Sequence, residues 1–253
     1  MGRMRRCEVT SPVGIPVRTI DPLGVDVYAG DLNGKPDWSK LVAAGPPWHF
    51  AMIKATEGLH YSPPWFRDNW PAIRAVAGER YGVDFFRGCY HYLRFELGGA
   101  AQAAFFCDAI DAAGGWGPGD LFPVVDVERA GNVNCTKQDV VRCVTDFVAE
   151  LKQRTGREVI LYAGSLLADL GITDHFGCSY LWIARYTPTL PKDKIERIGW
   201  DLSQVFAWQY CGDGESYLEG YPCSSPIGKT DISAVLVDGG GASALRWISE
   251  RVG

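Results

Sequence analysis

Short apolar segments recur along the whole chain, and helix-like segments separate the early ones; this alternation constrains the fold more than any other feature. Several segments are continuously apolar, which is typical of parallel strands buried on both faces. Strands that alternate with helices predict an α/β fold built around a parallel sheet. The expected strands are Gly24–Tyr28, Phe50–Thr56, Arg87–Leu93, Leu121–Glu128, Glu158–Ala163, Tyr180–Tyr186, Val205–Tyr210 and Thr230–Val235.

The helices expected between the early strands are Pro64–Arg80, Gly99–Ala113 and Thr136–Thr155. The last has the strongest signals, because Thr136 precedes an apolar stripe of helical period and Asp139 follows three residues later, as an imperfect capping box. The later connections are rich in Gly, Pro and charge and are less helical in pattern. Eight strands in 253 residues match one TIM-like barrel, and we expect an irregular one whose last strands are joined by loops.

The chain is predicted to form a single domain. Residues 1–22 read as an extended lead-in, and residues 23–253 hold the barrel. Within the barrel, Gly239–Gly241 separate the last strand from a closing helix at Ala242–Val252. We find no internal repeat and no linker rich in Gly, Ser or Pro that would lead to another module.

Composition excludes several classes of protein. Hydrophobic residues make up 47% of the chain and charged residues 22%, which suits a globular core and excludes disorder, coiled coils and collagen. No apolar run approaches the ~18 residues that cross a bilayer, so we expect no stable membrane association. The formal net charge is −5, from 25 basic and 30 acidic side chains, and no basic stripe predicts a nucleic-acid partner. A monomer is the default expectation.

The eight cysteines and four histidines do not indicate a metal site. No C-x-x-C pair occurs and the histidines are scattered, so we expect neither structural zinc nor another cofactor. Cys211 and Cys223 bracket a Gly-rich loop and are the best placed pair if a disulfide forms.

Two carboxylates end the fourth expected strand, as Asp126-Val127-Glu128. Side chains two apart on a strand point to the same face, with their Cα atoms about 6.6 Å apart. The C-terminal mouth of a barrel is where active sites lie. Two carboxylates crowded in a partly dry pocket cannot both ionise at low cost, so one stays protonated near neutral pH. An acid that can protonate a leaving oxygen is what glycoside hydrolysis needs.

Two further acids occupy equivalent places, Asp26 on the first expected strand and Asp231 on the last. The first and last strands of a closed barrel are neighbours, so these two side chains should converge on one side of the mouth. Singly, each could equally be a turn or cap acid at a strand end. Acids on three separate strands that point to one rim favour a functional cluster.

Several ordered stretches between about Gly24 and Val237 carry a family resemblance. They are Gly24–Val27, Pro36–Trp38, Phe50–Gly58, Gly88–Tyr92, Val124–Glu128, Ile160–Tyr162, Leu181–Tyr186, Trp208–Tyr210 and Thr230–Ser233. Together they resemble the glycoside hydrolase family 25 lysozymes, the Chalaropsis-type muramidases. The most specific stretch is Phe50–Gly58, which is similar to the family signature F-a-i-i-K-A-T-E-G.

The resemblance implies a (β/α)5(β)3 barrel that cleaves the β-1,4 bond between N-acetylmuramic acid and N-acetylglucosamine in bacterial peptidoglycan. It makes Glu128 the general acid and Asp126 its partner, acting on the 2-acetamido group of the substrate or on a water, with Asp26 and Asp231 completing the acidic cluster. Its implied sugar-cleft residues are Tyr90, Tyr162, Trp182, Tyr186 and Trp208.

Some positions depart from the family pattern and put the shape of the first loop in doubt. Tyr28 and Asp31 replace residues that are usually Ser and an amide, and Pro63 stands where the family tends to have Asp or Asn. Glu57 is interpreted as structural rather than catalytic. His91 should point away from the cleft, since it neighbours Tyr90 on one strand, and is interpreted as a core residue.

Alternatives remain open for both mechanism and function. Asp126 could activate a water, with inversion, or steady an attack by the substrate's own acetamido oxygen, with retention, and the D-x-E pattern favours the second weakly. The competing functions are a catalytically inactive barrel that binds glycan and a chitinase-like hydrolase.

The start of the chain suggests where the protein would act. Basic residues open it but no apolar stretch of secretory type follows, and no wall-binding module is recognised. We therefore expect a phage endolysin, made in the host cytoplasm and acting on the cell wall after release, with export by another route as the alternative.

Overall fold

The computed structural model describes residues 9–10, 16–17, 22–28, 35–80, 85–132, 134–212 and 214–235. The predicted spacer Gly239–Gly241 and the closing helix Ala242–Val252 lie outside the described residues, as do Asp31 and most of the lead-in.

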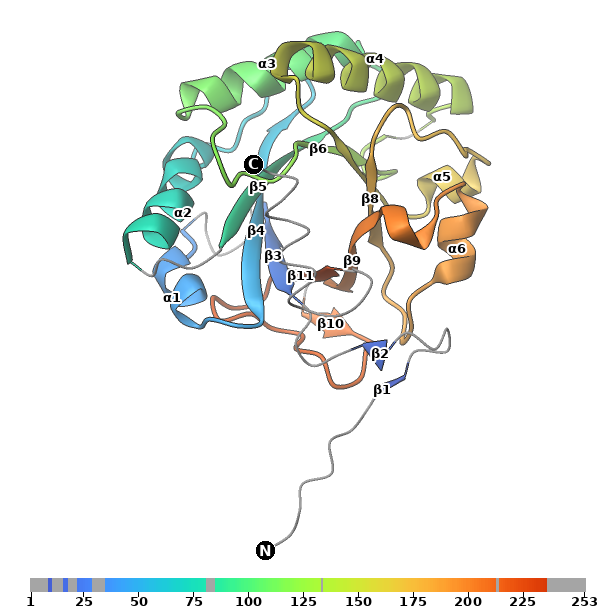
Figure 1. Cartoon of the computed structure of the whole chain (residues 1–253). Helices are drawn as coiled ribbons and strands as arrows, with labels where there is room; N and C mark the ends of the chain where they lie inside the picture. Colours follow the sequence, from blue (N-terminus) through green and yellow to red (C-terminus); the bar gives the residue numbers. More distant parts are fainter. Residues whose placement is uncertain are drawn as a thin grey trace, which may run out of the picture.

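Eight strands close into a barrel, which Figure 1 shows from one end. Hydrogen-bonded neighbours follow the order β3-β4-β5-β6-β7-β8-β9-β11, and β11 returns to pair with β3. The pairs from β3 to β9 are parallel, whereas β11 is antiparallel to both of its neighbours. The strands are β3 (Leu23–Val27), β4 (Trp48–Glu57), β5 (Phe86–Tyr92), β6 (Val124–Val127), β7 (Ile160–Ala163), β8 (Tyr180–Ala184), β9 (Val205–Gly212) and β11 (Asp231–Val235). The predicted irregular α/β barrel is confirmed.

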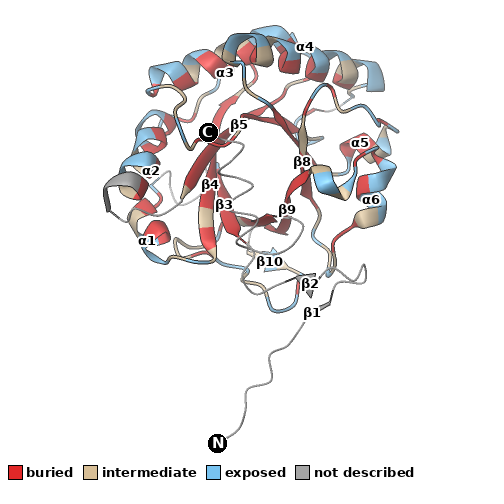
Figure 2. Ribbon diagram, viewed as in Figure 1, coloured by how far each residue is buried: buried red, intermediate tan, exposed pale blue. Residues whose placement is uncertain are grey.

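Helices surround the barrel and turn their exposed faces outward, as Figure 2 shows by burial. They are α1 (Trp38–Ala43), α2 (Phe66–Arg80), α3 (Gly99–Ala112), α4 (Lys137–Thr155), α5 (Leu166–Asp169) and α6 (Lys192–Arg197), with the 3-10 turn η2 (Leu202–Gln204) before β9. The capping box of α4 is complete, because the side chains of Thr136 and Asp139 each bond the other's backbone N–H. The two helices that join the later strands, α5 and α6, are short, in line with the weak helical pattern there.

Two apolar layers hold the barrel together. One lies between strands and helices and includes Val25, Ile53 and Val127. The residues that alternate with these point into the barrel, where Phe50 and Met52 belong to a second cluster. Glycines make room for them: a Cβ on Gly24 would collide with the ring of Phe50.

Three short strands lie outside the ring: β1 (Val9–Thr10) pairs with β2 (Pro16–Val17), and β10 (Glu215–Ser216) folds back on the end of β9. The candidate disulfide is not formed, because Cys211 and Cys223 both carry free thiols. Instead, the Cys211 thiol points at the backbone oxygen of Cys223, 3.7 Å away. In the described part of the chain, helices are too short or too polar to span a bilayer.

Candidate active site

The candidate site lies inside the barrel at the end where the parallel strands finish. Asp126 is on β6, and Glu128 follows the last residue of that strand. Asp126 is 5% exposed, and its Oδ1 is buried without a hydrogen-bond partner among the described residues. Glu128 is half-buried. The structure therefore brings the two predicted carboxylates to one face of the barrel, in a site mostly shielded from water.

Burial dominates the electrostatics of this pair. It raises the pKa of Asp126 well above the usual range, and the negative charge of Glu128 raises that pKa further. Burial also raises the pKa of Glu128, although the Tyr162 hydroxyl and the charge of Lys54 oppose the shift. Because each carboxylate makes it harder for the other to ionise, the pair can retain a proton at pH values where a solvated carboxyl would have lost it.

Asp26 and Asp231 stand directly opposite each other on β3 and β11. The side-chain amide of Gln209, on β9, links them: its Nε2 donates to Asp26 Oδ2 at 2.9 Å and to Asp231 Oδ2 at 3.3 Å. The expectation that the first and last strands bring these acids together is confirmed. The negative charge of Asp26 reaches the carboxyl pair, since it contributes to the raised pKa of Asp126.

Gln209 is the central polar residue of the site, and the sequence interpretation assigned it no role. Its Oε1 accepts hydrogen bonds from the hydroxyls of Tyr162 and Tyr186, each at 2.9 Å, while its Nε2 serves the two acids. It is 1% exposed. The available signal was its position as the one amide inside an otherwise apolar strand, because a buried polar group needs partners.

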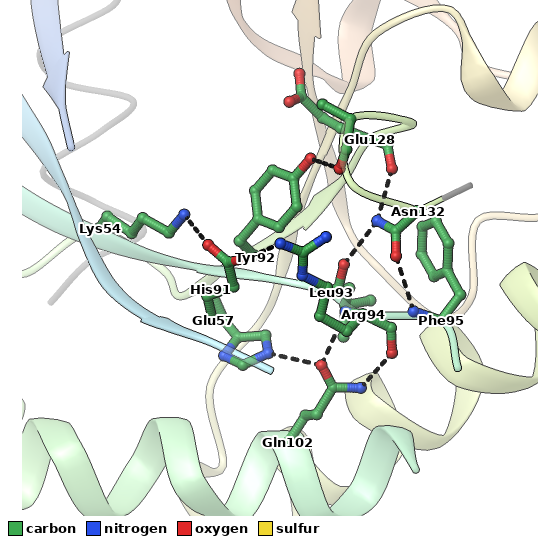
Figure 3. A network of polar contacts seen from close by, with 11 residues as sticks. Lys54, Glu57, His91, Tyr92, Leu93, Arg94, Phe95, Gln102, Glu128 and Asn132 are labelled. Atoms are coloured by element: carbon green, nitrogen blue, oxygen red, sulfur yellow. Dashed lines mark hydrogen bonds and ion pairs between the residues drawn. The ribbon is translucent and has the colours of Figure 1, made fainter. Parts of the chain in front are cut away.

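Lys54 on β4 carries a positive charge that lowers the pKa of both Asp126 and Glu128. Figure 3 shows Lys54 beside Glu57. Its Nζ pairs with Glu57 Oε2 at 2.5 Å and lies 4.5 Å from the centre of the Tyr92 ring. Glu57 also pairs with Arg94. Burial alone would raise the pKa of Glu57, but hydrogen bonds and charge from Lys54 and Arg94 outweigh it and lower that pKa. Glu57 therefore holds two cations in place, in agreement with its structural interpretation.

The side chain of Asn132 holds the backbone of Glu128, as Figure 3 also shows. Asn132 Nδ2 donates to the backbone oxygens of Glu128 and Leu93, both at 2.9 Å.

His91 is buried between Thr56 and Gln102; its ring nitrogens lie 2.7 Å from Thr56 Oγ1 and 3.2 Å from Gln102 Oε1, and burial lowers its pKa to about 3. A histidine that stays neutral in the core is what the sequence predicted.

The predicted cleft aromatics fall into three groups. Tyr90, Tyr162 and Trp182 point into the barrel but are buried. The rings of Tyr162 and Trp182 meet edge to face, with their centroids 4.6 Å apart. Tyr186 lies at the rim and is 44% exposed. Trp208 is not brought to the interior: it packs in the layer between strands and helices, where its Nε1 donates to the backbone oxygen of Arg185 at 2.7 Å.

Sequence reasoning missed two other aromatics at the mouth. Tyr28 and Tyr61 are exposed, as is Tyr186, and the three follow the ends of β3, β4 and β8, parallel strands that finish on the side of the carboxylates. Tyr217 is also exposed but follows β10, which runs antiparallel to β9. Three flat surfaces that a sugar chain could contact therefore lie at the carboxylate end of the barrel.

A closed α/β barrel with a buried carboxyl pair at its C-terminal mouth has the arrangement that glycoside hydrolases use. The comparison with known families agrees: the family described as "Glycosyl hydrolases family 25" matches residues 25–217. The chain belongs to this family, which confirms the resemblance found in the sequence.

Individual relatives extend the comparison. Lysozyme M1 of Streptomyces globisporus is 32% identical over 232 residues, which cover 85% of this chain and 72% of that protein. A bacterial lysozyme structure from Streptomyces coelicolor has a TM-score of 0.69 at 25% identity and covers 92% of this chain and all (100%) of that one. Protein YegX of Escherichia coli is 26% identical over 182 residues, covering 71% of this chain but only 60% of that relative's length.

Proposed function

We propose that this protein is a peptidoglycan hydrolase, an N-acetylmuramidase that cleaves the β-1,4 bond between N-acetylmuramic acid and N-acetylglucosamine. The observation that carries the proposal is the Asp126–Glu128 pair, two carboxyl groups with raised pKa values at the barrel mouth. Membership of glycosyl hydrolases family 25 and similarity to a lysozyme support the choice of substrate.

Glu128 acts as the general acid. Its raised pKa keeps a proton on the carboxyl group until the glycosidic C–O bond breaks, when that proton passes to the leaving oxygen. Positive charge then develops on the sugar ring, next to the carboxylates of the site. The surrounding acids stabilise that charge in a pocket where water cannot screen it.

Asp126 acts as the partner of the acid. Its buried Oδ1 has no hydrogen-bond partner among the residues that the structure describes and needs a donor, and the N–H of a 2-acetamido group on the substrate is a suitable one. A donor bound there would hold the acetamido oxygen ready to attack the anomeric carbon, with net retention. The alternative, in which Asp126 deprotonates a water and the configuration inverts, needs the same residue.

The exposed tyrosines at the mouth suit a polymeric substrate. Tyr186 follows strand β8, while Tyr28 and Tyr61 follow β3 and β4. Rings on both sides of the acids would contact sugar units on both sides of the cleaved bond. The buried Tyr162 and Trp182 instead shape the floor below the acids.

Digestion of purified peptidoglycan tests the proposal. The wild-type enzyme is expected to release fragments with muramic-acid reducing ends, identified by borohydride reduction and mass spectrometry, and to leave chitin largely intact. Glu128→Gln should abolish release, whereas Glu196→Gln on the outer helix α6 should not. Cleavage by Glu128→Gln at the wild-type rate would overturn the assignment, and preferential cleavage of chitin would support the chitinase-like alternative.

The anomeric configuration of the first product decides between the two roles of Asp126. Proton NMR of a short digest is expected to show the β-anomer first, the result of retention. An α-anomer at early times would indicate that Asp126 activates water.

We further infer that the enzyme acts on the cell wall, because its substrate lies outside the cytoplasmic membrane. We also expect the enzyme to be a monomer. Release at phage lysis is the expected route, and a gene that lies outside any lysis cassette would favour export. The molar mass in solution, measured by light scattering, tests whether the protein is a monomer.

A further inference from the structure

Arg185 occupies a fixed position at the rim, directly after β8. Its backbone N–H donates to the backbone oxygen of Gln209 at 3.1 Å, and its own backbone oxygen accepts from Trp208 Nε1 at 2.7 Å. Both bonds tie the residue to β9, the neighbouring strand. The backbone that carries this side chain is therefore as rigid as the barrel itself.

The guanidinium of Arg185 forms no ion pair with any of the residues that the structure describes. It is half-buried, and its one hydrogen bond within the described chain runs from Nη1 to the backbone oxygen of Ala184 at 3.0 Å. A guanidinium has five N–H donors, and burying a cation is costly unless an anion accompanies it. Burial accordingly lowers the pKa of Arg185, although the charge of Asp169 nearby opposes that shift.

The side chains of Arg185 and of Glu128, the general acid, border the same open space next to Gly164, the residue that follows β7. A Cβ on Gly164 would lie 3.9 Å from Arg185 Nη1 and 4.0 Å from Glu128 Oε1. Since glycine leaves that point empty, a substrate group that reaches Glu128 passes directly beside the guanidinium.

A second arginine makes this part of the rim positive. Arg129, whose side chain is 54% exposed, pairs at 3.5 Å with Asp169, which also accepts from Ser165 at 3.0 Å. Asp169 thus pairs with Arg129 and acts on Arg185 only through its charge, in a protein whose formal net charge is −5. The local excess of positive charge runs against the overall charge of the chain.

We propose that Arg185, with Arg129 beside it, binds a carboxylate carried by the muramic acid unit of the substrate. The inference rests on the proposed muramidase function and adds to it the group that the site recognises. Two carboxylates are available on peptidoglycan: those of the peptide stem, and the lactyl carboxylate that is exposed once the stem is removed. Chitin has neither, so this contact discriminates between the two polymers.

The test compares three substrates: glycan strands with peptide stems, strands whose stems an amidase has removed, and stem-free strands whose lactyl carboxylates are converted to methyl amides. Arg185→Gln is expected to lower kcat/KM by about 10- to 100-fold on strands that carry the recognised carboxylate, mainly through KM. Arg185→Lys should recover part of the loss, because it keeps the charge but not the planar fork. Arg197→Gln, on the outer face of α6, serves as the control.

A loss confined to stem-bearing strands would assign the stem carboxylates, a loss confined to stem-free strands would assign the lactyl carboxylate, and a loss on both would mean that the arginine binds whichever carboxylate is present. On the methyl amides, wild type and Arg185→Gln should be equal. An equal loss on all three substrates, or no loss on any, would overturn the inference while wild-type cleavage still upheld the muramidase. A wild-type enzyme inactive on every strand would overturn the proposed function and this inference with it. Matching thermal melts verify that the variants are folded.

Discussion

At the scale of single residues, Gln209 connects groups that no stretch of sequence shows as neighbours. Its amide can face only one way: Oε1 accepts two tyrosine hydroxyls, so Nε2 must face the two acids. The Tyr162 hydroxyl has a single proton, which it donates to Gln209, and the same hydroxyl lowers the pKa of Glu128. Gln209 therefore competes with Glu128 for this hydroxyl and limits how far it lowers the pKa of the general acid.

Replacing Gln209 therefore tests a positioning role. Gln209→Met removes both sets of hydrogen bonds at similar volume, and kcat is expected to fall by about 100-fold with little change in KM. The freed Tyr162 hydroxyl can then donate to Glu128, so the pKa of Glu128 falls and the alkaline limb of the pH–rate profile moves to lower pH. Gln153→Met, on the outer face of α4, is the control; an unshifted alkaline limb would contradict the argument.

The raised pKa of Asp126 predicts that this residue destabilises the fold at neutral pH. A carboxyl whose folded pKa exceeds its unfolded value of about 3.9 binds more protons in the folded state, so its contribution to stability is lost as pH rises above about 4. Asp126→Asn should thus raise Tm at pH 7 but not at pH 4, while it lowers activity. Thermal melts at both pH values test this, and a variant that melts below wild type at pH 7 would refute it.

At the scale of elements, hydrophobic pattern predicted most strands and the three long helices, with bounds that differ by a few residues. The early part of the expected strand Leu121–Glu128 is not in β6, which starts only at Val124. Leu121 instead joins the barrel-interior cluster from a loop. Apolar character alone predicts burial, but not whether a buried residue belongs to a strand ladder.

The resemblance implies that Trp208 lies in the cleft, and the strand pattern neither corrects this nor shows that Gln209 faces the interior. The run Val205–Cys211 is apolar around a single amide, so alternation does not show which residues face the interior. Pairing with β8 and β11 decides it and turns Gln209 inward and Trp208 outward. The convergence of Asp26 and Asp231, by contrast, was predictable, because closure of any barrel makes its first and last strands neighbours.

The helix that backs the active-site strands offers an element-scale prediction. Thr136 caps α4, and its side chain accepts from the Asp139 backbone N–H at 3.2 Å. Thr136→Ala should lower the free energy of unfolding by about 1 kcal/mol. It should leave kcat unchanged, because Thr136 is exposed and its hydrogen bonds run to Asp139. Urea unfolding measures the loss, with Gln153→Ala as a mid-helix control; an unchanged midpoint would show that the cap does not contribute.

At the scale of the whole molecule, the net charge is negative, whereas the two arginines proposed to contact the substrate are positive. The formal net charge of −5 repels an anionic wall at long range, whereas Arg129 and Arg185 face the substrate at contact. Salt screens the two unequally: the Debye length falls from about 30 Å at 10 mM to about 8 Å at 150 mM, and partly buried contacts are screened less. KM for purified peptidoglycan should therefore fall several-fold over that range of salt.

Neutralising acids far from the site separates the two effects. The double variant Asp193→Asn, Glu196→Gln on α6 makes the net charge less negative without touching the mouth, so its KM should depend less on salt than that of wild type. Arg185→Gln should keep the full dependence, because the long-range charge is almost unchanged while the contact is lost. A KM that rises steadily with salt in wild type would mean that attraction at the rim, and not repulsion by the whole chain, controls the approach of the enzyme to the wall.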